Sequence, residues 1–125
     1  MRVMYVSGPF GHDDKIHGVQ RNIIVASEVS LRLWANGWAV ICPHKNTADF
    51  QHTRIPWDTW MAGDLEFVRR SDAVMMLPGW ELSPGAKLER NEALARGIPV
   101  YYYSIEQPLP VPQEPVKEFA WPRKL

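Results

Sequence analysis

Short apolar runs alternate with longer segments of helical periodicity along the first hundred residues. The apolar runs are rich in β-branched and aromatic residues and end at turn-forming residues, which is typical of buried strands. They predict strands at Val3–Ser7, Trp38–Cys42, Ala73–Leu77 and Pro99–Tyr103. The segments between them predict helices at Val19–Asn36, Trp57–Arg70 and Pro84–Arg96. Gly37 and Gly97 directly follow two of these helices, as C-terminal stops commonly do.

Strands that alternate with helices predict a parallel sheet, because parallel neighbours need a crossover connection. The strands are apolar almost throughout, which indicates burial on both faces. We therefore expect an α/β three-layer sandwich: a Rossmann- or flavodoxin-like parallel sheet of four or five strands with helices on both faces. Ligands of such folds bind outside the carboxyl ends of the strands.

Two stretches depart from this alternation. Residues His44–Pro56 are polar and predict a long loop, and loops of that length in a small domain are often functional. From Gln107 onward prolines crowd the chain, so we expect a domain over 1–106 and a proline-rich tail over 107–125. Within that tail, Val116–Trp121 is a candidate edge strand.

Composition narrows the function classes. The 125 residues suffice for one core, and Lys+Arg and Asp+Glu both total 14, so the net charge is zero. A neutral chain has no broad electrostatic footprint for a nucleic acid polymer or an anionic membrane. The single cysteine, Cys42, excludes an intrachain disulfide, and no apolar stretch approaches the roughly 20 residues of a membrane span. A cytoplasmic enzyme or binding protein that acts on a small molecule is expected.

The loop after the first predicted strand reads Ser7-Gly8-Pro9-Phe10-Gly11. Its glycine spacing does not fit a dinucleotide fingerprint, and no P-loop lysine follows. The Gly8-Pro9 pair is either a plain turn or a loop whose backbone approaches a small ligand closely. The four histidines show no metal-ligand spacing, so neither a metal nor a cofactor is expected.

The segment Leu77-Pro-Gly-Trp-Glu-Leu-Ser-Pro-Gly-Ala-Lys-Leu-Glu-Arg90 raises a more specific possibility. Ser83 followed by proline is a strong helix start, and the free N–H groups of such a start also suit a phosphate. Gly85 weakens the first turn, which makes sense if a ligand must approach the backbone. Trp80 either stacks on a flat ligand or covers the core. Glu89 shares a helical face with two alanines, and it is either a surface glutamate or a nucleophile.

In these residues the chain resembles the nucleoside 2-deoxyribosyltransferase-like superfamily, over roughly Arg2 to Tyr103. The resemblance rests on motifs whose order and spacing agree: Tyr5-Val6-Ser7-Gly8-Pro9-Phe10, Gly63-Asp64-Leu65, Ser71-Asp72-Ala73-Val74, Ser83-Pro84-Gly85-Ala86-Lys87-Leu88-Glu89, Ala93, Gly97 and Pro99-Val100.

The resemblance implies that Glu89 is the nucleophile at the anomeric carbon, that Tyr5 orients it, and that Asp64 holds or protonates the departing base. At the position of Ser83 the 2'-deoxynucleoside 5'-phosphate N-hydrolases carry serine, whereas the transferases carry aspartate. A serine at a helix N-terminus favours a phosphate. The substrate-binding residues implied are Ser7, Gly8, Pro9, Phe10, Ser83, Gly85, Ala86 and Trp80.

The resemblance thus implies hydrolysis of the N-glycosidic bond of (2'-deoxy)nucleoside 5'-monophosphates through a covalent glycosyl–Glu89 intermediate. Two alternatives stay open: a deoxyribosyltransferase that exchanges bases, and a nucleotide-binding module without turnover. The resemblance also implies a homodimer, because a neighbouring subunit contributes a phosphate contact in the hydrolases.

Overall fold

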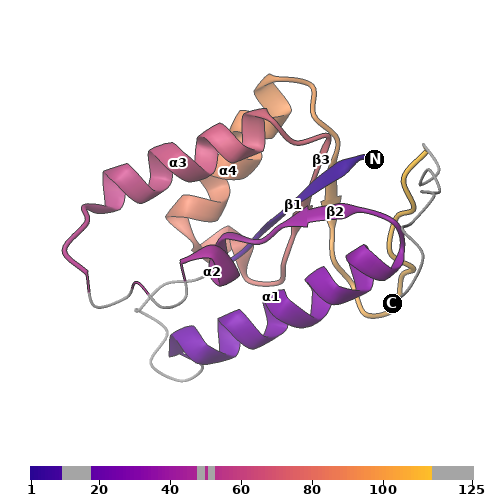
Figure 1. The fold of residues 1–125 in the computed structure, drawn as a ribbon, viewed down its shortest axis with the longest axis horizontal. Coiled ribbons are helices and arrows are strands. Elements are labelled where there is room, and N and C mark those ends of the chain that lie inside the picture. Colours follow the sequence, from indigo (N-terminus) through magenta and orange to yellow (C-terminus); the bar gives the residue numbers. More distant parts are fainter. Residues whose placement is uncertain (10–17, 48–49, 51–52, 114–125) are drawn as a thin grey trace, which may run out of the picture.

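The computed structural model describes residues 1–9, 18–47, 50 and 53–113. Its strands are β1 (Val3–Ser7), β2 (Ala39–Ile41), β3 (Ala73–Met76) and β4 (Val100–Tyr102). Its helices are α1 (Gly18–Ala35), α2 (Pro43–Asn46), α3 (Trp57–Arg69) and α4 (Pro84–Ala95), and a 3₁₀ turn, η2 (Trp80–Leu82), precedes α4. Figure 1 shows their arrangement.

The four strands form one parallel sheet in the order β2-β1-β3-β4. β1 lies between β2 and β3, so the chain reverses its direction of winding next to β1. The predicted parallel α/β sheet is therefore confirmed, with four strands in the described part of the chain.

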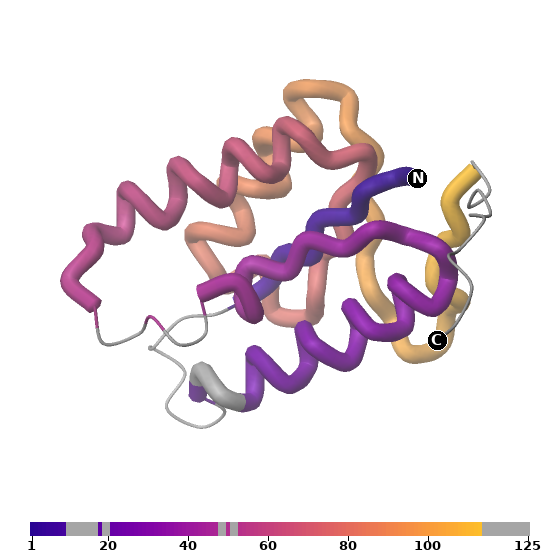
Figure 2. The backbone as a smooth tube through the Cα atoms, in the orientation of Figure 1, coloured from indigo at the N-terminus to yellow at the C-terminus, as the bar shows by residue number. Residues whose placement is uncertain are grey.

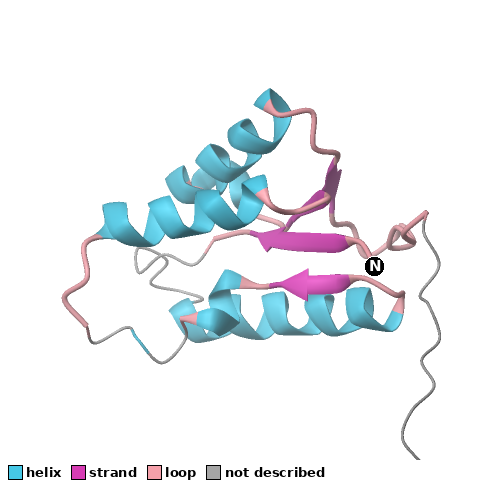
Figure 3. Cartoon of the chain, turned by 45° about the horizontal axis from the view of Figure 1, so that its top comes forward, coloured by secondary structure: helices cyan, strands magenta, loops and turns pink. Residues whose placement is uncertain are grey.

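Helices lie on both sides of the sheet (Figure 3), and the side chains of β1 alternate between the two cores beneath them. Met4 and Val6 pack in the core that α1 covers, together with buried residues of that helix. Tyr5, by contrast, packs in the core beneath α3 and α4. Because successive residues of a strand point to opposite faces, Ser7 shares the α3/α4 face with Tyr5. Three layers result, as the sequence predicts.

One predicted loop is partly wrong, since the first three residues of the expected His44–Pro56 loop belong to the short helix α2. Pro43 stands at its first position, and the backbone N–H groups of Lys45 and Asn46 donate to the Cys42 carbonyl. A helix of four residues is too short to show a period in the sequence. The other predicted boundaries agree with the structure to within one residue.

The beginning of the proline-rich segment packs on the domain. Leu109 is buried in the α1-side core, and the indole of Trp38 donates to the Pro110 carbonyl over 2.8 Å. The tube in Figure 2 shows this segment, in yellow, beside the C-terminal end of α1. The candidate edge strand Val116–Trp121 lies outside the described residues. None of the helices in the described ranges is long and apolar enough to cross a membrane.

Candidate active site

The carboxyl ends of β1 and β3 and the N-terminal half of α4 meet at one edge of the sheet. Ser7 ends β1, and Gly8-Pro9 continues from it. Leu77 follows β3 and donates its backbone N–H to the Ser7 carbonyl over 2.7 Å. Beyond η2, Ser83 begins the connection into α4. This edge is where ligands of parallel α/β folds bind.

Glu89 is a buried carboxyl group with two hydroxyl donors. Its side chain comes from the second turn of α4, and the residue is only 6% exposed. The phenol of Tyr5 donates to Oε2 over 2.8 Å, and the hydroxyl of Ser7 donates to Oε1 over 2.6 Å. Ala86 and Ala93, which lie about one turn on either side, are buried as well. Such small residues let α4 approach the sheet closely, so that Glu89 reaches the hydroxyl groups of β1.

The environment of Glu89 perturbs its ionisation. Burial raises the pKa of the Glu89 carboxyl from 4.5 to about 7, although the hydrogen bonds from Ser7 and Tyr5 act in the opposite direction. The negative charge of Asp64 also raises this pKa, which places Asp64, on α3, within electrostatic reach of Glu89. Burial raises the pKa of Asp64 itself from 3.8 to about 6.

Tyr5 stays protonated beside these two carboxyl groups. Burial, followed by the charges of Glu89 and Asp64, raises the pKa of the Tyr5 phenol well above 10. Near neutral pH the site therefore holds a hydroxyl donor and two carboxyl groups that compete for one proton. One carboxylate and one carboxylic acid within electrostatic reach of each other can supply a nucleophile and a general acid, as paired carboxyl groups do in glycosidases.

Ser83 caps α4 as predicted. Its hydroxyl accepts a hydrogen bond from the backbone N–H of Ala86 over 3.2 Å, with proline at the next position. A Cβ added at Gly85 would lie 3.5 Å from Sδ of Met61 and 4.0 Å from the ring of Trp57, both on α3. Those are ordinary contact distances, so packing does not require glycine at this position. The prediction that Ser83, Gly85 and Ala86 bind a phosphate stays a prediction.

The glycine of the Gly8-Pro9 loop has a packing reason. A Cβ on Gly8 would lie 2.7 Å from Cβ of Leu77, closer than real side chains approach. Gly79 has a positive φ of 89°, and a Cβ added to it would lie 3.3 Å from Cγ of Pro9, which is also a tight contact. The backbone approach that the sequence suggests is therefore an approach between two loops of the protein. Whether a ligand also contacts Gly8 and Pro9 stays a prediction.

Sequence reasoning missed one supporting residue, His44, and one contact, between Ser7 and Glu89. His44, buried at the start of α2, donates its Nε2–H to the Pro9 carbonyl over 2.8 Å and so supports the loop after β1. Burial lowers its pKa, which favours the neutral ring. The hydroxyl of Ser7 donates to Glu89, and the predicted contact of Ser7 with the substrate stays a prediction. The only signal in the sequence is that both residues lie at the carboxyl ends of adjacent strands.

Trp80 lies against a cation and a second aromatic ring. The guanidinium carbon of Arg90 is 4.9 Å from the Trp80 ring centroid, and the ring of Tyr102 is 5.7 Å away at 44°. Nε of Arg90 donates to the Tyr102 hydroxyl over 2.7 Å. Trp80 also packs against the α3/α4 core, which agrees with the covering role. Its stacking on a base stays a prediction, and Phe10 lies outside the described residues.

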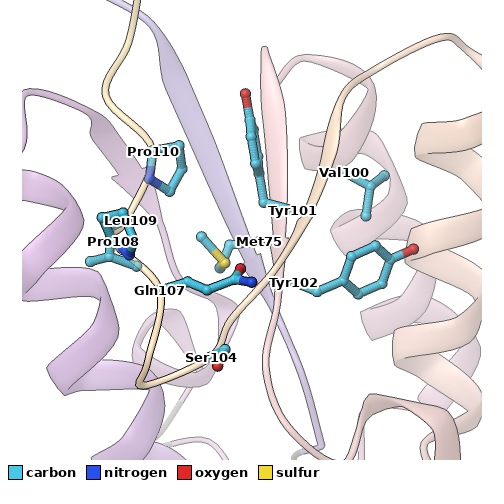
Figure 4. Close-up of a pocket in the computed structure, with 9 residues that line it drawn as sticks. All are labelled: Met75, Val100, Tyr101, Tyr102, Ser104, Gln107, Pro108, Leu109 and Pro110. Atoms are coloured by element: carbon cyan, nitrogen blue, oxygen red, sulfur yellow. The ribbon is translucent and has the colours of Figure 1, made fainter.

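A cavity of about 390 Å³ lies along the edge strand β4, and Tyr102, which contacts Trp80, is part of its lining (Figure 4). Segment 107–110 forms its other wall. None of the residues predicted for the site lines it; those that do are Met75, Val100, Tyr101, Tyr102, Ser104, Gln107, Pro108, Leu109 and Pro110. Within the described ranges no group of three or more His, Cys, Asp or Glu side chains is placed to hold a metal ion.

The fold and the site define a Rossmann-like α/β domain with a buried glutamate at the switch point of its sheet and a partly buried aspartate within electrostatic reach of it. A solved structure with this fold is a 2-desoxiribosyltransferase from Leishmania mexicana, with a TM-score of 0.59 and 13% identity. The match covers 82% of this chain but only 64% of the other, and at this identity it establishes the fold alone. The family described as "Domain of unknown function (DUF4406)" matches residues 2–102, so the chain belongs to that family. No curated protein matches the sequence.

Proposed function

We propose that the protein hydrolyses the N-glycosidic bond of (2'-deoxy)nucleoside 5'-monophosphates and releases free base and sugar 5-phosphate. One observation carries the proposal: a buried glutamate held by two hydroxyl groups, with a second perturbed carboxyl group within electrostatic reach. Perturbed carboxyl groups gathered at a ligand-binding edge are typical of acid–base and nucleophilic sites.

The chemistry proceeds in two displacement steps. One oxygen of the Glu89 carboxylate attacks C1' of the sugar as the C1'–N bond breaks. The electron pair of the C1'–N bond leaves with the base. The reactive form has its proton on Asp64, and it is the minor form because the pKa of Glu89 lies above that of Asp64; in this form Asp64 gives its proton to the departing base. The Asp64 carboxylate then takes a proton from water while that water attacks C1', which breaks the bond to Glu89 and restores both side chains.

The serine at the start of α4 supports a phosphorylated substrate. Helix N-terminal N–H groups attract an anion, and a serine adds a hydroxyl donor without negative charge. We therefore infer that the 5'-phosphate binds at Ser83, Gly85 and Ala86, and the base at Trp80. We also infer that the active species is a homodimer, in which the second subunit completes the phosphate site; light scattering at assay concentration tests this.

A screen for base release tests the function. The protein is incubated separately with each common ribo- and deoxyribonucleoside 5'-monophosphate, and free base is followed by chromatography. Release that is lost in Glu89→Ala and kept in Glu92→Ala, a surface change one turn further along α4, supports the proposal.

The structural likeness to a desoxiribosyltransferase favours one second candidate, base exchange. Incubation with an unphosphorylated deoxynucleoside plus a different free base distinguishes it, because only a transferase then yields the new nucleoside. Saturable nucleotide binding with no base released over long incubation would instead identify a binding module.

A further inference from the structure

Ser7 offers Glu89 a donor whose position is fixed from three sides. Ser7 is 1% exposed, and its carbonyl accepts a hydrogen bond from the Leu77 N–H. The next residue, Gly8, packs against Leu77 too closely to leave room for a Cβ. A hydroxyl on so constrained a backbone is preorganised toward the carboxyl group that it contacts.

The two donors to Glu89 divide its oxygens between them. Tyr5 and Ser7 lie two residues apart on one face of β1, so that the phenol meets Oε2 and the shorter serine meets Oε1. An ionised carboxylate only accepts hydrogen bonds, whereas a protonated one must itself donate. Two hydroxyl groups that both donate therefore match the ionised form, and the 2.6 Å contact of Ser7 has the length of a charge-assisted bond.

We propose that Ser7 is a positioning residue for the nucleophile: its hydroxyl fixes Oε1 of Glu89, favours the ionised carboxylate and orients it toward C1'. This inference rests on the proposed function, and it gives Ser7 a role in addition to the substrate contact that the sequence suggests, which stays a prediction. It acts through Glu89, and no contact between Ser7 and substrate is required.

The direct test is a titration of the Glu89 carboxyl by ¹³C NMR on glutamate-labelled protein, with its signal assigned by its absence in Glu89→Gln. Ser7→Ala is expected to raise the pKa of Glu89 by about one unit or more, because a hydrogen bond to the charged form is lost. Ser71→Ala is the matched control, since Ser71 is buried and donates to the Phe67 carbonyl at the other end of the sheet. A shift in Ser7→Ala no larger than in the control would overturn the proposal.

Ser7→Cys separates donation from packing. A thiol is of similar size but donates weakly, so a positioning role predicts a raised pKa, as in Ser7→Ala. If Ser7 only fills space, Ser7→Cys should titrate like the wild type, and the proposal fails. Should Ser7→Ala not fold, as judged by circular dichroism, Ser7→Cys against Ser71→Ala decides the question alone.

Kinetics supply a second readout. The active form carries an ionised Glu89 and a protonated Asp64. Among molecules in which the two carboxyl groups share one proton, the fraction in this form falls about tenfold for each unit by which the pKa of Glu89 rises. Ser7→Ala should therefore lower the maximal rate about tenfold and move the alkaline limb of the pH profile upward by about one unit. An unchanged profile, with base release and a Glu89 adduct intact, would refute the role of Ser7 alone. If the wild type releases no base from any nucleotide, the proposed function fails, and the titration by itself decides whether Ser7 holds the carboxylate.

Discussion

Replacing the buried carboxyl group by an amide, Glu89→Gln, is expected to stabilise the protein at neutral and alkaline pH while it abolishes turnover. The folded-state pKa of Glu89 is about 7, above the ordinary value of 4.5. Between these values the folded protein binds a proton that the unfolded chain has lost. The contribution of Glu89 to stability is thus fully present below pH 4.5 and is lost as the pH rises through the folded-state pKa.

The magnitude follows from the two pKa values. Each unit corresponds to about 1.4 kcal/mol, so the rise from 4.5 to about 7 predicts a loss of about 3 kcal/mol from the free energy of unfolding. The amide is neutral at every pH and escapes this loss. Tyr5 and Ser7 can still bond to it, because a hydroxyl can donate to the amide oxygen or accept from its N–H₂ group.

The assay is urea unfolding of wild type and Glu89→Gln at pH 5 and pH 8. The difference in free energy of unfolding between the variant and the wild type should shift by about 2–3 kcal/mol in favour of the variant from pH 5 to pH 8. Glu92→Gln is the control on the same helix. Glu92 accepts hydrogen bonds from Arg69 and Arg96, which lower its pKa, so its replacement should not stabilise the protein at pH 8. A stability difference between wild type and Glu89→Gln that does not change with pH would refute the argument that burial perturbs this group.

Three further predictions concern the site and its support. A plot of the rate of base release against pH should be bell-shaped, with apparent pKa values near 6 and 7 from the coupled Asp64 and Glu89. A rate that rises steadily up to about pH 9 would contradict this assignment. Ser83→Asp should lower kcat/KM for 5'-monophosphates at least about tenfold by charge repulsion, whereas Ser83→Asn, an equally good helix cap, should not; equal losses in both would remove the phosphate from this helix end. Gly8→Ala should destabilise the protein by about 1–3 kcal/mol in urea unfolding because its Cβ meets another side-chain atom at 2.7 Å, while Gly63→Ala, with open space around it on α3, should stabilise it by up to about 1 kcal/mol.

Local patterns were sufficient to predict the fold. Each strand is a short apolar run, and each crossover carries a helical period, so the parallel sheet follows from the alternation itself. The start of α4 was predictable for a local reason as well, because Ser83 and the proline after it act within one turn. The helix α2 escaped prediction because four residues are too few to show a helical period. Its role comes from His44, which is buried and donates to the Pro9 carbonyl.

The site was predictable only in part, because its contacts join elements far apart in the chain. The face that Glu89 shares with Ala86 and Ala93 indicated a close approach to another element but did not identify that element. The hydrogen bond from Tyr5 was implied by the resemblance to a family, and the structure contains it. The bond from Ser7, 82 residues away in sequence, depends on how closely α4 packs on β1, which no local pattern encodes.

Trapping the covalent intermediate tests the central claim most directly. The protein is mixed with a nucleotide that it turns over, quenched in acid during turnover, digested and analysed by mass spectrometry. The account predicts a sugar phosphate attached to the peptide that contains Glu89, and its disappearance in Glu89→Gln. Base release at an undiminished rate with no adduct on that peptide, or with the adduct on another residue, would contradict it.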